Sequence, residues 1–183
     1  MATSSSDFPR DPAPRSSSLI ASAIDKLVAI CGVVPYALVA LGLRLIIARI
    51  FFLAGQTKIA GPAIPIALFN RDGDFAITLP AEIKPSTFEL FQTQYAALPT
   101  PPTVAAYLFT YAEFVLPVCL VLGFATRLSA LALLVMTVLV QVYVMPEALW
   151  TTHVYLFAIL MVLMSVGPGA ISLDALVRTV YRK

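Results

Sequence analysis

The chain has 183 residues, of which 60% are apolar and only 12% are charged, and its formal net charge is +2. Soluble domains are about 45–50% apolar and about 25% charged, so this composition excludes a soluble enzyme, a nucleic-acid reader and a disordered regulator. So small a net charge gives no reason to expect an anionic polymer as a partner, and we expect no nucleic acid to bind. We expect the lipid bilayer to surround most of the polypeptide.

The first 34 residues precede the first expected membrane span. Residues 1–18 are rich in serine, proline and charge, which predicts a disordered cytoplasmic tail. Residues 19–34 repeat apolar side chains at helical spacing, with polar residues on the opposite side, and this pattern predicts a helix lying on the inner membrane surface. Pro35 then interrupts the helical pattern, because proline is costly inside a helix and tolerated in its first turn.

Four apolar segments have the roughly 17 to 25 residues that a membrane-spanning helix needs. They predict an all-α fold: a four-helix transmembrane bundle with an N-terminal interfacial helix and a long external loop after the first span. Pro146 stops the third segment, and Gly167-Pro168-Gly169 stops the fourth. Tight links join the second, third and fourth segments, so these neighbours must be antiparallel and in contact. The expected spans are residues 36–56, 103–123, 127–145 and 150–166.

The external loop, residues 57–102, is the long connection of the expected bundle. Residues 70–73 read Asn-Arg-Asp-Gly and predict a turn, and residues 75–79 predict a short strand. Residues 86–89 read Ser-Thr-Phe-Glu, the pattern of a helix capping box. A loop this long is unusual without structure of its own, so we expect a cap over the bundle mouth, the alternative being a solvated linker. The helix of this cap presents one apolar face, formed by Phe88, Phe91, Tyr95 and Leu98.

The distribution of basic residues orients the expected bundle. With four spans, both termini lie on one side together with the link at Arg127, and this side carries most of the twelve Lys and Arg residues. The positive-inside rule therefore predicts a multi-pass protein with both termini in the cytoplasm. The four-span domain is expected over residues 36–176, followed by a basic cytoplasmic tail at residues 177–183.

Five polar residues within the expected spans are candidates for a buried or binding site, because ionisable groups in a membrane usually face protein or water: Arg44, Arg49, Glu113, Gln141 and His153. Glu113 has a depth similar to those of Arg44 and Arg49, so we predict a buried pair between Glu113 and one of the two arginines, without deciding which. A polar chamber of Arg49, Glu113, Gln141 and His153 is predicted under the external loop. The alternatives are an ion pair that only fixes helix register, a Gln141 that bridges helices, and a solvated His153 at the membrane surface.

Further polar residues lie near the ends of the spans. Gln56, Lys58 and Arg127 are candidates for binding an anion or lipid headgroups, since long basic side chains extend to the membrane surface. Thr126 and Ser172 are candidate helix N-caps. No cluster of His, Cys, Asp and Glu has the spacing of metal ligands, so we expect no metal site.

Several segments carry a resemblance to the DoxX family. Residues 43–45 and 51–58 resemble its first-helix signature, an arginine followed by a glycine and a lysine at the outer end. Glu113, the G-x-x-T-R link at residues 123–128 and the G-P-G-x-x-S-L-D segment at residues 167–174 resemble later parts of the family pattern. The resemblance implies a four-helix inner-membrane protein whose functional positions are Arg44, Lys58, Glu113 and Arg127.

The resemblance also implies a link to membrane oxidoreductase assemblies, since family members include a thiosulfate:quinone oxidoreductase subunit and components of complexes that handle thiol and oxidative stress. We therefore expect a quinone-facing or anchoring subunit, with quinone as the candidate cofactor and a soluble or membrane redox partner. The chain has no visible redox centre, so electrons must come from a partner or a bound quinone. The alternatives are a structural or assembly protein and a small transporter, and oligomerisation stays open.

Overall fold

The structure is a computed structural model that describes residues 21–22, 24–26, 35–65 and 76–181. It divides into two units, Met1–Pro35 and Tyr36–Lys183. In the first unit, the described residues between 21 and 26 are helical, within the expected interfacial helix. The expected N-terminal tail, most of that helix, the turn at residues 70–73 and the last two residues lie outside the described residues.

The second unit contains four helical segments long and apolar enough to cross a membrane. The all-α prediction is confirmed, and the observed bounds lie close to the expected ones. Three of the spans are single α-helices, and the fourth begins with a 3-10 turn, η1 (Pro146–Ala148), and a π-helical turn, η2 (Leu149–His153), before α6 (Val154–Ser165). The spans are α2 (Tyr36–Lys58), α4 (Pro102–Leu122), α5 (Thr126–Tyr143) and the segment Pro146–Ser165.

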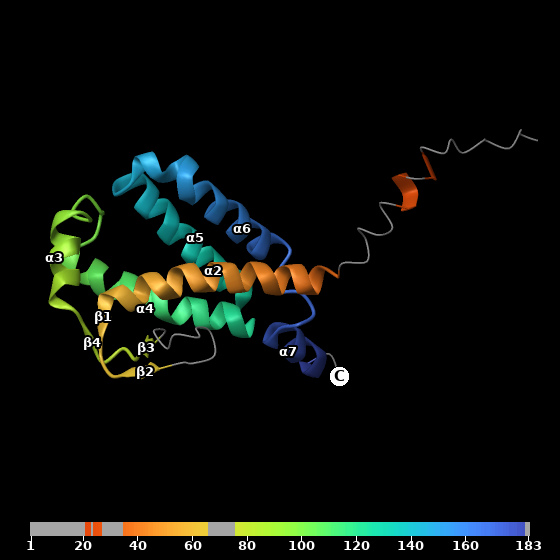
Figure 1. Cartoon of the computed structure of the whole chain (residues 1–183), viewed down its shortest axis with the longest axis horizontal. Coiled ribbons are helices and arrows are strands. Elements are labelled where there is room, and N and C mark those ends of the chain that lie inside the picture. Colours follow the sequence, from red (N-terminus) through yellow and green to blue (C-terminus); the bar gives the residue numbers. More distant parts are fainter. Residues whose placement is uncertain (1–20, 23, 27–34, 66–75, 182–183) are drawn as a thin grey trace, which may run out of the picture. The chain divides into compact units, whose positions relative to one another are not determined.

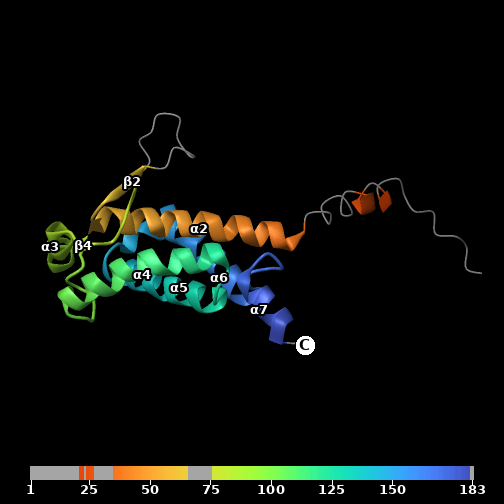
Figure 2. The ribbon, with the colours of Figure 1, turned by 90° about the horizontal axis from the view of Figure 1, so that it is seen from below.

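The spans pack as a bundle in which α2 lies against α4 and α6, and α5 lies against α4 and α6 (Figures 1 and 2). Its core is made of small and aliphatic side chains, among them Ala105, Ala130, Leu133 and Leu160, which are fully buried. The outward faces are also apolar: Leu108 is 60% exposed and Leu128 is 67% exposed. Apolar side chains on both the inside and the outside are what a bundle in lipid requires, and the protein is a multi-pass membrane protein.

One end of the bundle, called the cap end here, carries α3 (Pro85–Thr93) and four short strands (Figure 2). The strands form two antiparallel pairs, in which Ile59 lies opposite Ile83 and Ile64 lies opposite Ile77. The expected strand at residues 75–79 is confirmed by β3. The strands are β1 (Ile59–Ala60), β2 (Ala63–Pro65), β3 (Ala76–Thr78) and β4 (Glu82–Ile83).

Helix α3 packs on α4, and it carries Phe88 and Phe91 of the predicted apolar face. The predicted helix was too long, because α3 ends at Thr93 and Tyr95 and Leu98 follow it, although Phe91 and Leu98 are both buried. The capping-box prediction is wrong. Proline in the first turn starts α3 at Pro85, so Lys84 is the N-cap and makes no side-chain cap bond. Thr87 instead donates its hydroxyl hydrogen to the Lys58 carbonyl at 3.0 Å, which fastens α3 to the end of α2.

The opposite end, called the α7 end here, holds the α4–α5 link and the helix α7 (Leu173–Tyr181) (Figure 1). Asp174 caps α5, because its carboxylate accepts hydrogen bonds from the backbone nitrogens of Ala125 and Thr126 at 2.8 and 2.9 Å. The cap predicted for the Thr126 side chain is therefore wrong. Ser172 caps α7 as predicted, since its Oγ accepts a bond from the Ala175 nitrogen at 3.1 Å.

Candidate functional site

A buried ion pair joins α2 to α4 near the cap end. The Lys58 ammonium lies 2.5 and 2.6 Å from the two carboxylate oxygens of Glu113. The two side chains are 10% and 8% exposed. Because both oxygens are engaged, the charges neutralise each other within the low-dielectric interior.

The sequence positions Lys58 for this contact in two ways. Lys58 follows Arg44 by fourteen residues and Phe51 by seven, so it continues the inward stripe of α2. Side chains on a helix lean toward its N-terminus, so the lysine at the last residue of α2 points back into the bundle. Gly55, one turn earlier, has no side chain to keep the helices apart. A Cβ at this position would lie 3.2 Å from the Glu113 Cβ.

The cap covers the ion pair. The Lys58 carbonyl accepts bonds from the Lys84 nitrogen and the Thr87 hydroxyl, both at 3.0 Å. The Lys58 ammonium lies 5.8 Å from the centre of the Phe91 ring, within the range of a cation–π contact. Tyr95 packs against Phe91 in a tilted arrangement with ring centres 4.6 Å apart. Burial, and after it the negative charge of Glu113, raises the pKa of Tyr95.

The prediction that an arginine pairs with Glu113 is wrong. Arg44 is fully buried, but it lies toward the α7 end, where its Nη2 donates to the carbonyl of Ile171. Arg49 lies about 140° around the helix from Arg44, and its side chain is exposed on the outside of the bundle. The predicted depth of Glu113 was also wrong, because Gly55 lies against Glu113 while the Arg44 guanidinium lies against Gly123. Glu113 is therefore level with the end of α2, where the Lys58 side chain reaches it.

The predicted chamber is formed only in part. Gln141 and His153 do meet: His153 Nδ1 and Gln141 Oε1 are 2.5 Å apart, and the Gln141 amide donates to the Pro146 carbonyl at 2.7 Å. His153 is buried, which corrects the alternative of a solvated residue. Arg49 is absent from this arrangement because it faces outward, and Glu113 is absent because its carboxylate binds Lys58.

The three residues predicted to bind anions or headgroups make internal bonds. The ammonium of Lys58 points into the bundle and not toward headgroups as predicted. The Gln56 amide pairs with both backbone groups of Thr78, at 2.7 and 3.2 Å, and so fixes β3 to α2. Arg127 is exposed and donates to the carbonyls of Ser165 and Val166 at the end of α6, at 3.2 and 3.4 Å. Anion or headgroup binding by Gln56 and Arg127 stays a prediction.

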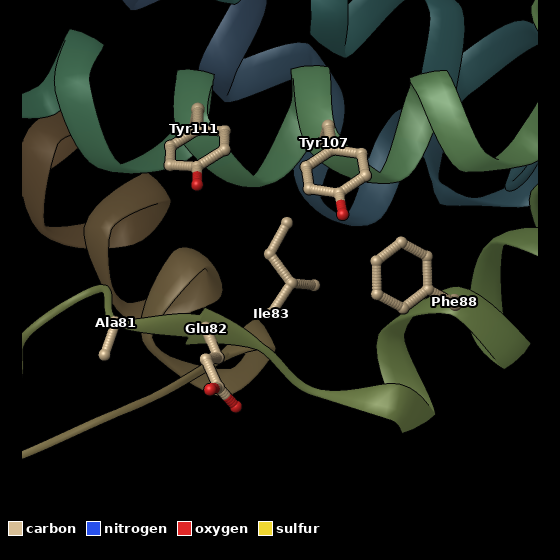
Figure 3. A pocket seen from close by; sticks show the side chains of 6 residues that line it. All are labelled: Ala81, Glu82, Ile83, Phe88, Tyr107 and Tyr111. Carbon is tan, nitrogen blue, oxygen red and sulfur yellow. The ribbon is translucent and has the colours of Figure 1, made fainter.

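A pocket of about 370 Å³ lies between α4 and the segment formed by β4 and α3. Figure 3 shows Tyr107 and Tyr111 extending from α4 with their hydroxyl groups toward β4, while the Glu82 carboxylate points away from them. Neither tyrosine hydroxyl bonds to any part of the chain that the structure describes. The lining residues are Ala81, Glu82, Ile83, Phe88, Tyr107 and Tyr111.

Tyr107 and Tyr111 were not among the site residues predicted from the sequence. The rings of Tyr107 and Tyr111 are stacked, with centres 6.4 Å apart, and Tyr107 meets the edge of Phe88 at 5.4 Å. Their spacing of four residues places them on one side of α4, and this spacing was the signal that could have found them. Within the described residues, no group of three His, Cys, Asp or Glu side chains could hold a metal ion.

Comparison with known proteins gives one match. The model of the family described as DoxX matches residues 39–146, which cover the first three spans and the cap. No curated protein and no solved structure matches the chain significantly.

Proposed function

Because this chain belongs to the DoxX family, we propose that it is the quinone-facing and anchoring subunit of a membrane oxidoreductase complex. A redox partner would supply the electrons, and this chain would hold the quinone and keep the complex in the membrane. The observation that carries the proposal is the pocket between α4 and the cap, with its two unbonded tyrosine hydroxyls.

The chemistry of the pocket matches a quinone head group. A quinone is a flat ring with two carbonyl oxygens that accept hydrogen bonds. Tyr107 and Tyr111 offer two hydroxyl donors, and Phe88 adds an aromatic edge at the same place. The volume of about 370 Å³ lies in the range of small-molecule sites and suits a single substituted ring.

The position of the pocket also suits a lipid-soluble ligand. Tyr107 and Tyr111 are 48% and 51% exposed and lie on the face of α4 that also exposes Leu108 and Val115. A ring in the pocket would therefore leave its isoprenoid tail along an apolar surface that already faces lipid. The ligand would enter sideways from the membrane without displacing the cap.

Binding of a decyl-tailed benzoquinone to the purified protein in nanodiscs tests this proposal. Each lost hydrogen bond costs about 0.5–1.5 kcal/mol, so replacing both Tyr107 and Tyr111 by phenylalanine should weaken binding about 5- to 150-fold. Tyr155→Phe is the matched control, because it removes an exposed phenol of α6 that lies outside the pocket. Unchanged affinity in the double variant, or no saturable binding beyond that of empty nanodiscs, would refute the proposal.

A structural or assembly role is the second candidate, and the ion pair favours it. Lys58 and Glu113 hold α2 and α4 in one register, which is a well-attested use of buried charges. The Lys58→Met/Glu113→Gln double variant separates the two roles. If quinone binding persists in this variant while assembly with the partner fails, the pair serves assembly.

We also propose that the α7 end faces the cytoplasm of a bacterial-type inner membrane. Arg127 and Arg178 lie at this end, as the positive-inside rule requires. A fluorescent reporter that matures only in the cytoplasm, fused after Lys183, should fluoresce. A dark reporter whose fusion is expressed at the normal level would reverse the orientation.

A further inference from the structure

The outward face of α2 carries a charge within the membrane. Arg49 is exposed, and its neighbours Ile46 and Ile50 are 51% and 39% exposed. The side chain of Arg49 forms neither a hydrogen bond nor an ion pair with the described residues. The inward face of the same helix is formed by Ala40, Arg44, Ile47, Ala48, Phe51, Gly55 and Lys58.

The depth of Arg49 makes this arrangement costly. It lies thirteen residues after Tyr36 (49 − 36) and nine before Lys58 (58 − 49). At 1.5 Å per residue, it is about 20 Å from one end of the span and about 14 Å from the other. An arginine deep in lipid costs about 2.5–3.5 kcal/mol or more, and such residues almost always face protein or water.

A second observation lies on the same face. Gly42 precedes Arg49 by seven residues, so the two lie on one side of α2. A Cβ added at Gly42 would meet nothing within 4 Å, so no contact with the described residues requires a glycine there. Glycine inside a helix costs about 1 kcal/mol relative to alanine. In membranes, small residues on an open helix face allow another helix to approach closely.

We infer that this face of α2, defined by Gly42, Ile46 and Arg49, docks a transmembrane helix of another protein that carries an Asp or Glu opposite Arg49. A second helix packed closely against this face would explain the glycine at position 42. A carboxylate on that helix would pair with the charge of Arg49. The inference rests on the proposed function in that it treats the chain as one subunit of a membrane complex.

Two other occupants of this face of α2, a second copy of the chain and a lipid headgroup, do not fit. A second copy of the chain does not supply the acid, because the two carboxylates of the four spans are both unsuitable. Glu113 is bound to Lys58, and Glu147 lies in the first turn of the fourth span, at the cap end and not at the depth of Arg49. A lipid phosphate would lie beyond the nearer end of the span, which is about 14 Å from Arg49 along the helix axis. A contact with lipid would also not explain why position 42 is a glycine.

Photo-crosslinking in native membranes tests the inference. A benzophenone-bearing residue at position 46 should crosslink to a spanning segment of one other protein, and mass spectrometry of the crosslinked peptide should find an Asp or Glu within about one turn of the attachment point. The same probe at position 108, on the exposed face of α4, should not capture this segment. Crosslinks to lipid alone, to a second copy, or to a segment without an acid would overturn the inference.

Charge variants complete the test. Arg49→Gln should reduce the crosslink and the copurified partner about tenfold or more, whereas Arg49→Lys should retain much of both. Arg49→Glu combined with a lysine in place of the partner's acid should restore the complex. Unchanged capture by Arg49→Gln would overturn the inference.

Quinone binding distinguishes this inference from the proposed function. Arg49→Gln and Gly42→Leu should bind the benzoquinone in nanodiscs as the native chain does, because both changes lie outside the pocket. If the native chain crosslinks to an acidic helix but binds no quinone, only the quinone-facing role is refuted.

Discussion

Glu113→Gln removes the charge that the Lys58 ammonium contacts and keeps the size of the side chain. The ammonium is then left in a site where its side chain is only 10% exposed. Breaking a buried ion pair from one side costs about 3–5 kcal/mol. Since about 1 kcal/mol shifts the unfolding midpoint of a chain of this size by about 2–4 °C, we expect a loss of about 6–20 °C in Tm.

Thermal unfolding of the purified protein in a mild detergent, followed by circular dichroism, measures this loss. The Lys58→Met/Glu113→Gln variant should recover more than half of it, because no unpaired charge is left in the site. Tyr155→Phe is the control and should change the stability by no more than about 0.5 kcal/mol, as exposed substitutions usually do. Native and Glu113→Gln proteins that melted together, or a double variant no more stable than Glu113→Gln, would refute the reasoning.

Three further outcomes follow from the geometry of the bundle. Gly55→Val should lower the free energy of unfolding by about 1–3 kcal/mol, because even a Cβ at this position lies 3.2 Å from the Glu113 Cβ. Gly42→Ala should raise the free energy of unfolding by up to about 1 kcal/mol, because a Cβ there meets no described atom within 4 Å. Urea titration in detergent compares the two variants. Asp174→Ala should cost about 1–2 kcal/mol by removing the cap of α5, and equal melting of variant and native protein would contradict the cap. The raised pKa of Tyr95 favours the neutral phenol in the folded state, so its contribution to stability is present below about pH 10 and is lost as the pH rises through the folded pKa. When the pH is raised above about 10, the Tyr95→Phe variant should therefore lose less stability than the native chain. Melting curves recorded at a series of pH values would measure the difference.

The spans were predictable because their signals are local. Apolar runs of suitable length identify them, and Pro35, Pro146 and Gly167 mark three of their ends. The apolar face of α3 was also readable from spacing alone. The start of α3 was not, because Pro85 sets the first turn and overrides the Ser-x-x-Glu pattern that follows.

The contacts of the candidate site depended on information that spacing does not carry. The depth estimated from helix lengths made Arg44 and Arg49 the expected partners of Glu113, whereas the structure places Glu113 beside Gly55, where Lys58 reaches it. The inward stripe of α2, read over its full length, would have placed Lys58 with Arg44 and set Arg49 apart. The cap from Asp174 had no local signal, since 48 residues separate it from Thr126.

That long-range cap has a consequence for biosynthesis. The first amide groups of α5 receive their acceptor from a residue that follows the fourth span, so the ribosome delivers it only after both helices have been translated. Until then the start of α5 must rely on water or headgroups. The C-terminal segment therefore completes the capping of α5 only after the fourth span has been synthesised.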